Sequence, residues 1–193
     1  MLRNGKFTFE VHDNFQKQTY RNRCYVYGAN GKQLLNVPVQ KISGKQLYRN
    51  VKIDYRSNWQ SEHLKTLYSA YNSSPFFEYY IDDLNELFSK KETYLIDLNI
   101  NIFKKITKLL QEQINFNKTT DYNLKIQKDY RYLVNAKAKE AFKLDKYTQV
   151  FDNKHGFISN LSILDLLFNE GPAANIYLSK ILKTLDKKDT VNI

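Results

Sequence analysis

Apolar and polar residues alternate at the start of the chain, as they do in a half-buried β-strand. Phe7, Phe9 and Val11 fall on one face of such a strand, with polar residues between them. We therefore predict a strand over residues 7–11 that turns one face toward the core. A second short strand is predicted near residues 50–55.

The strongest local signal is Asn30-Gly31, which lies between two strand-like stretches at residues 23–29 and 32–39. This pattern predicts a β-hairpin with Asn30 and Gly31 at its tip, both with positive φ, in a type I′ turn. Pro38 has no backbone donor, so the second arm should lie at a sheet edge or end there.

After residue 57 the apolar spacing changes to the three-and-four pattern of amphipathic helices. Ser57 and Gln60 have the spacing of a capping box, and Asp97 is expected to cap a later helix. Residues 115–146 are polar, and we expect one strand and one short helix there, followed by a late strand at residues 147–151. The predicted helices cover residues 57–71, 75–88, 97–110, 161–169 and 172–185.

These elements predict an α/β fold with an N-terminal mixed sheet, including the hairpin, covered by C-terminal helices. The 193 residues suit a single domain over residues 1–193, and the chain has no internal repeat or low-complexity linker. Its hydrophobic content of 42% is enough to form a core.

The sequence also indicates in which cellular compartment the protein is found. No apolar run approaches the ~20 residues that span a bilayer, and the first residues do not form a signal peptide. A single cysteine, Cys24, excludes an intrachain disulfide. We therefore expect a cytoplasmic protein without a membrane span.

The formal charge of +10 is compatible with nucleic acid, anionic lipid or phosphate-bearing small molecules as partners. Most of the excess is lysine scattered over the predicted helices, and no run reaches five Lys or Arg residues. This distribution favours a solvated surface with an anionic small molecule as partner. A nucleic-acid binding module is the less favoured alternative.

Several common site motifs are absent. The segment from Gly28 to Lys32 has the wrong spacing for a phosphate loop and lies between two predicted strands. His12, His63 and His155 are far apart and there is one cysteine, so no metal site is predicted. No cofactor can be inferred, because nucleophile-elbow and dinucleotide motifs are also missing.

Basic residues are dense in the predicted loop at residues 15–23, between two strands. Lys17, Arg21 and Arg23 supply donors for phosphate or carboxylate, and Asn22 adds an amide. We predict that they converge on a concave anion site. The alternative is an exposed basic loop with a structural arginine.

Two residues are candidates for acid–base chemistry. His63 shares the apolar face of its predicted helix with Trp59, which is typical either of a core histidine or of a poised acid or base. Asp165 lies in an apolar helix, so its carboxylate must be ion-paired or hydrogen-bonded, or have a raised pKa. We predict that this partner is Arg21 or Arg23, holding the last helices against the N-terminal sheet.

Several stretches, in this order, resemble the WbqC-like family. They are Gln16-Lys17-Gln18-Thr19-Tyr20-Arg21-Asn22-Arg23, Tyr27-Gly28-Ala29-Asn30-Gly31-Lys32, Val37-Pro38-Val39, Trp59 with His63, Ala70-Tyr71, Ser74-Pro75-Phe76-Phe77, and the stretch from Leu161 to Pro172. The resemblance covers about residues 7–178.

The resemblance implies a bacterial protein connected with surface polysaccharides such as O-antigen. It implies a transferase, with glycine or aminoacyl transfer as the reaction, or an accessory protein of precursor synthesis. The partner would be a nucleotide-linked sugar or an activated amino acid. The family also implies a further strand and loop ahead of residue 7, so a truncated, inactive copy is a further alternative.

Overall fold

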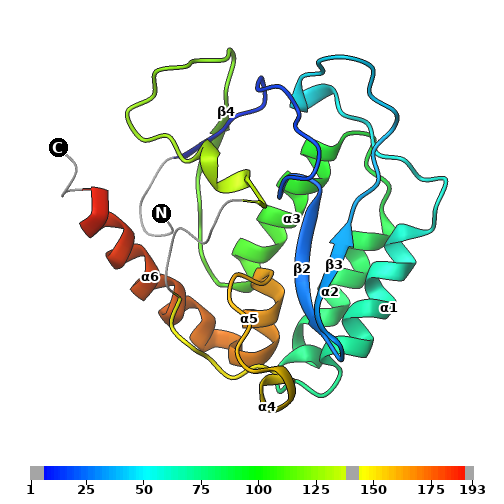
Figure 1. Cartoon of the computed structure of the whole chain (residues 1–193), viewed down its shortest axis with the longest axis vertical. Helices are drawn as coiled ribbons and strands as arrows, with labels where there is room; N and C mark the ends of the chain where they lie inside the picture. Colours follow the sequence, from blue (N-terminus) through cyan, green and yellow to red (C-terminus); the bar gives the residue numbers. More distant parts are fainter. Residues whose placement is uncertain (1–6, 138–143, 190–193) are drawn as a thin grey trace.

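The computed structural model describes residues 7–137 and 144–189, which form a mixed α/β structure (Figure 1). Strand β1 (Phe7–Phe9) pairs in parallel with β4 (Phe116–Lys118), and β2 (Arg23–Gly28) pairs antiparallel with β3 (Gly31–Asn36). The predicted α/β class is confirmed. Its strands form two separate two-stranded sheets, one parallel and one antiparallel.

The predicted hairpin is present, but its turn differs from the prediction. Pairing closes at Gly28 and Gly31, so the residues at the tip are Ala29 and Asn30. Gly31 alone has a positive φ, of 97°, and Asn30 does not, so the type I′ geometry predicted from Asn30-Gly31 is wrong. Glycine takes the single left-handed position because it has no Cβ to clash. Strand β3 ends before Pro38, as predicted.

All five helices predicted from the apolar spacing are present, and a short additional one precedes the last two. The α-helices are α1 (Trp59–Tyr71), α2 (Phe77–Ser89), α3 (Leu95–Leu109), α4 (Asp152–His155), α5 (Ile163–Glu170) and α6 (Ala174–Asp189). Three 3₁₀ turns are η1 (Tyr48–Asn50), η2 (Arg131–Val134) and η3 (Gly171–Ala173). None of the helices in the described part of the chain has the length and apolar character needed to cross a bilayer.

The strand predicted at residues 147–151 is wrong, because this segment is a loop that leads into α4. The amide of Gln149 takes the place of a partner strand. Its Nε2 donates to the Ile158 carbonyl at 2.9 Å, and its Oε1 accepts from the Ile158 N–H at 2.8 Å. One side chain thus satisfies the backbone groups that a neighbouring strand would otherwise pair.

The structure also differs from the prediction in one strand, one helix cap and the first residue of one helix. Residues 50–55 form only isolated bridges rather than a strand. The capping box is not formed, since Asn58 occupies the cap position of α1 without a side-chain hydrogen bond. Helix α3 begins at Leu95, so Asp97 lies in its first turn, where a carboxylate favours the positive end of the helix. In residues 115–146, one strand (β4) and one short helix (η2) are present as expected, and residues 138–143 lie outside the described residues.

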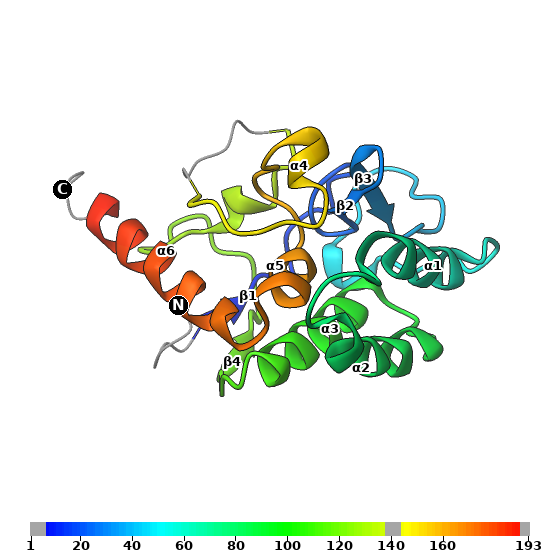
Figure 2. The same ribbon diagram turned by 90° about the horizontal axis from the view of Figure 1, so that it is seen from below.

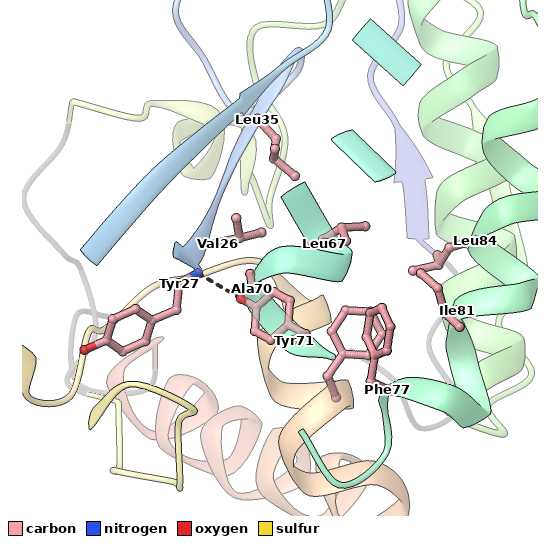
Figure 3. Close-up of a cluster of buried hydrophobic side chains, with 10 residues drawn as sticks. Val26, Tyr27, Leu35, Leu67, Ala70, Tyr71, Phe77, Ile81 and Leu84 are labelled. Carbon is pink, nitrogen blue, oxygen red and sulfur yellow. Dashed lines mark hydrogen bonds between the residues drawn. The ribbon is translucent and has the colours of Figure 1, made fainter. Parts of the chain in front are cut away.

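The main core lies between the hairpin and helices α1, α2 and α5. Figure 3 shows the Tyr71 ring beneath strand β2, where its hydroxyl accepts a hydrogen bond from the Tyr27 N–H at 2.9 Å. Phe168 of α5 is fully buried, with its ring 5.0 Å from those of both Tyr71 and Phe77. Helix α5 therefore fills the space between the hairpin and α6 (Figure 2).

Candidate functional site

Asn36, the last residue of β3, is where two of the predicted site residues meet. The amide Nδ2 of Asn22 donates to Asn36 Oδ1 at 3.0 Å and to the Val37 carbonyl at 3.1 Å. His63 Nε2 lies 3.2 Å from the Asn36 carbonyl oxygen. The end of the hairpin thus brings a residue of the basic loop and a residue of α1 to one point.

His63 is buried at this point, with 7% of its surface exposed. Burial lowers the pKa of its imidazole, which is therefore neutral at pH 7. Because the partner of Nε2 is a carbonyl, Nε2 carries the proton and Nδ1 keeps a lone pair. Among the described residues, no hydrogen bond to Nδ1 is present. The Trp59 ring contacts this imidazole edge-on, at 5.1 Å between centroids.

Three residues that adjoin Asn36 or His63 carry buried polar atoms without a hydrogen-bond partner in the part of the chain that the structure describes. Asn22 bonds to Asn36, Arg23 pairs with Asn36 across the hairpin, and the Trp59 ring contacts His63. Of six buried side-chain atoms without a hydrogen bond in the described chain, three are Asn22 Oδ1, Arg23 Nε and Trp59 Nε1. Buried polar atoms in folded proteins nearly always have partners, because an unpaired one costs about 1–3 kcal/mol. Unpaired buried atoms on residues around one strand end, which also contacts a neutral histidine, make this end of the hairpin a candidate ligand site. We call Asn22, Arg23, Trp59 and His63 the Asn36 cluster.

Arg21 is engaged elsewhere. It is 6% exposed, forms an ion pair with Asp13, and its guanidinium lies 5.2 Å from the centre of the Tyr48 ring. Asn99 Nδ2 donates to the Arg21 carbonyl at 2.6 Å, which fixes the backbone of the loop to α3. Lys17 is exposed. The structure therefore brings Asn22 to His63, whereas Arg21 is occupied by partners outside the Asn36 cluster.

The predicted partner of Asp165 is wrong. Asp165 is fully buried, and its Oδ1 accepts from the Tyr71 hydroxyl at 2.8 Å. Its Oδ2 accepts from the Tyr147 hydroxyl at 2.6 Å and from Gln149 Nε2 at 2.9 Å. Among the side chains that the structure describes, in residues 7–137 and 144–181, no arginine or lysine forms an ion pair with it.

The three hydrogen-bond donors to Asp165 are neutral groups and not the predicted cation, so they affect its pKa differently. Burial raises the pKa of its carboxyl, and the three hydrogen bonds that it accepts oppose the rise only in part. Burial and the same carboxylate also raise the pKa of the Tyr71 and Tyr147 hydroxyls, which stay protonated as donors. Sequence reasoning recognised that Asp165 needs a partner and missed the partners. The abundance of tyrosine, with hydroxyls that also require partners, was the available signal.

Two clefts lie along α3. One, of about 420 Å³, runs between α2 and α3, and the other, of about 390 Å³, lies at the end of α3; both are lined in part by Lys104 and Lys108. Acidic groups are interspersed there. Lys105 lies 2.8 Å from Asp83 and 3.0 Å from Glu86, and the neighbouring lysines hold the pKa of Glu86 at about 2. The cations along α3 are therefore partly neutralised.

The hairpin, α1 and the basic loop define a small α/β protein with a candidate ligand site at the end of the hairpin. The model of the WbqC-like protein family matches residues 1–143 of the 193. The chain therefore belongs to the WbqC-like protein family. The Asn36 cluster lies within the matched residues, and Asp165 lies outside them. No curated protein and no solved structure matches the chain.

Proposed function

We propose that this protein is a transferase that binds an anionic donor, a nucleotide-linked sugar or an activated amino acid, at the Asn36 cluster. The observation that carries the proposal is that Asn36 adjoins three candidate residues. Asn22 and Arg23, its hydrogen-bond and strand-pairing partners, each have an unpaired buried polar atom, and its carbonyl contacts the neutral His63. Family membership supports a place in the cytoplasmic synthesis of bacterial surface-polysaccharide precursors such as O-antigen.

Each residue has a chemical role in this proposal. Arg23 is partly exposed as a residue while its Nε is buried and unpaired, and its guanidinium would hold a phosphate or carboxylate of the donor. Asn22 Oδ1 would accept from a hydroxyl or amino group of the ligand. Lys17, exposed on the same loop, would add to the attraction for an anion.

His63 would act as the general base. Its Nδ1 lone pair takes the proton of the attacking hydroxyl or amine while the new bond to the transferred group forms. The leaving group departs with the electron pair of the bond that breaks. Arg21, through Asp13, and Asp165, through Tyr71, would act as positioning residues that hold the loop and α1.

The site has a built-in reporter, because Trp59 is the only tryptophan of the chain and contacts His63. Titration with a panel of nucleotide-linked sugars and activated amino acids should change Trp59 fluorescence for at least one compound. Arg23→Lys should then weaken binding roughly tenfold, because lysine cannot bind bidentately. The exposed Arg49→Ala serves as the control and should bind as the wild type does.

The role of His63 is separable from binding. His63→Gln should keep the affinity within a few-fold and abolish transfer of the labelled group from the bound donor. If no compound of the panel alters Trp59 emission, or if Arg23→Ala binds as tightly as the wild type, the proposed site is refuted.

The alternative of nucleic-acid binding receives less support. A continuous basic stripe across several helices would favour it, whereas Glu86 and Glu92 interrupt the lysines between α2 and α3. Gel-shift titration with single-stranded DNA separates the two functions. If the protein binds nucleic acid, the fraction of shifted DNA should fall steeply as salt is raised, and Arg23→Ala should not change it.

A further inference from the structure

The segment that follows β4 exposes an unusual number of large apolar side chains. Figure 1 shows it projecting from the edge of the molecule beside β4. Leu124 is 78% exposed and Ile126 is 42% exposed. The exposed large apolar residues of the segment are Tyr122, Leu124, Ile126, Tyr132 and Leu133, five of nine in the described part of the chain. We call residues 119–137 the apolar loop.

The apolar loop is held in its conformation by Arg131. Its guanidinium donates to the carbonyls of Asn123 and Leu124, at 2.9 and 3.5 Å. It also binds Asp129 through both carboxylate oxygens and lies 5.0 Å from the centre of the Tyr122 ring. A largely buried cation thus fixes the backbone that carries Leu124, so a partner bound there would meet a preorganised surface.

Positive charge surrounds the same apolar side chains. Lys125 and Lys128 are exposed on either side of Ile126, and Lys137 is exposed further along. The apolar loop, residues 119–137, contains four cationic side chains and two acidic ones. One of these acids, Asp129, is already paired with Arg131, so the loop presents a net positive charge to a partner.

We propose that the apolar loop docks this protein on the surface of an anionic lipid membrane. Leu124 and Ile126 enter the boundary between headgroups and acyl chains, and the tyrosines lie at headgroup level, where an apolar ring with a polar hydroxyl is favoured. Lys125 and Lys128 bind the anionic headgroups. Exposed aliphatic side chains flanked by lysines match this partner better than nucleic acid, which offers no apolar interior. The proposal is independent of the transferase proposal.

Co-sedimentation with vesicles tests this directly. The full chain should bind vesicles of phosphatidylglycerol and phosphatidylcholine, bind pure phosphatidylcholine vesicles far more weakly, and dissociate as salt is raised. Lys125→Gln with Lys128→Gln should weaken binding roughly tenfold or more. Leu124→Ser with Ile126→Ser should weaken it to a similar extent.

The chain offers a matched control for the apolar substitutions. Tyr79 is 78% exposed and Leu34 is 44% exposed, which equals or nearly equals the exposure of Leu124 and Ile126, and both lie outside the apolar loop. Tyr79→Ser with Leu34→Ser should bind vesicles as the wild type does. Leu124→Trp adds a second readout, because its emission should shift to the blue on vesicles while buried Trp59 stays constant.

Three outcomes would overturn the proposal. One is the absence of binding to anionic vesicles at low salt. Another is an equal loss of vesicle binding in the variant Leu124→Ser with Ile126→Ser and in its control, Tyr79→Ser with Leu34→Ser. The third is a concentration-dependent dimer in analytical ultracentrifugation that Leu124→Ser abolishes while vesicle binding is unchanged. That last result would assign the apolar loop to contacts between two copies of this chain.

Discussion

The hydroxyl oxygen of Tyr71 donates a hydrogen bond to the Asp165 carboxylate at 2.8 Å and accepts one from the Tyr27 N–H at 2.9 Å. Through this one atom, strand β2 and helices α1 and α5 are joined in the main core. Both side chains are buried, so water cannot replace either bond. These two hydrogen bonds lead to predictions of how the free energy of unfolding changes with pH and with substitution of Tyr71 or Asp165.

Asp165→Asn should flatten the dependence of stability on pH. Burial raises the folded-state pKa of Asp165 above its ordinary value of about 4. The stability that this group contributes is therefore fully present below about pH 4 and is lost as pH rises through the raised pKa. Urea unfolding from pH 4 to 8 should show this loss in the wild type and in the exposed control Asp82→Asn. Equal slopes for wild type and Asp165→Asn would contradict the raised pKa.

Tyr71→Phe should lower the free energy of unfolding by about 2–4 kcal/mol, because it leaves the Tyr27 N–H and one Asp165 oxygen buried without this partner. Tyr79→Phe removes the same hydroxyl from a ring that is 78% exposed and should change stability by less than about 0.5 kcal/mol. Guanidinium denaturation of both variants measures the difference. A small and equal effect at the two positions would argue against the network.

Gly171→Ala should be more destabilising than Gly44→Ala. Both glycines have positive φ, of 54° and 73°, so alanine costs about 1 kcal/mol at each through the backbone. At Gly171 the added Cβ would also lie 2.5 Å from Cδ1 of Phe76, whereas at Gly44 it would meet nothing within 4 Å. Thermal unfolding should rank the variants in this order. In a Phe76→Ala background, the difference in unfolding temperature between Gly171→Ala and Gly44→Ala should shrink. If this difference persists there, contact with the Phe76 ring is not its cause.

The single cysteine should react slowly while the protein is folded. Burial raises the pKa of the Cys24 thiol to about 11, and a hydrogen bond with Ser162 opposes this rise. Since the thiolate is the reactive form, modification by an aromatic disulfide at pH 8 should be roughly a hundredfold slower than in urea. Ser162→Ala should slow it further, as the opposing hydrogen bond is lost. Equal rates in the folded and unfolded chain would disprove the shift.

Local patterns were sufficient to predict five of the helices and the presence of the hairpin, because spacing along one segment determines which face is buried. They did not predict the short helix α4 or the geometry of the hairpin turn. They could not predict the partner of β1, since β4 lies more than 100 residues away, with Phe7 opposite Phe116. The failed strand at residues 147–151 has the same origin. The Gln149 side chain, rather than another strand, satisfies the Ile158 backbone, and a local pattern cannot show this.

The candidate site was partly predictable for a similar reason. Residue type suggests Asn22, Arg23 and His63 one by one as candidates. Asn36, which joins Asn22 to His63, has no distinctive sequence context. For Asp165, apolar neighbours correctly indicated burial and a need for partners. Whether those partners are cations or hydroxyls depends on packing between distant segments, which no local pattern records.

The late position of α5 in the chain has a consequence for synthesis on the ribosome. Tyr71 and Asp165 are 94 residues apart. At about 5–20 residues per second, the apolar face of the hairpin and α1 waits roughly 5–20 s for the helix that covers it. During that interval the nascent chain lacks Phe168, which packs against Phe77 and its neighbours in the folded core. We therefore expect chaperones that bind exposed aromatic segments to recognise the nascent chain during this interval.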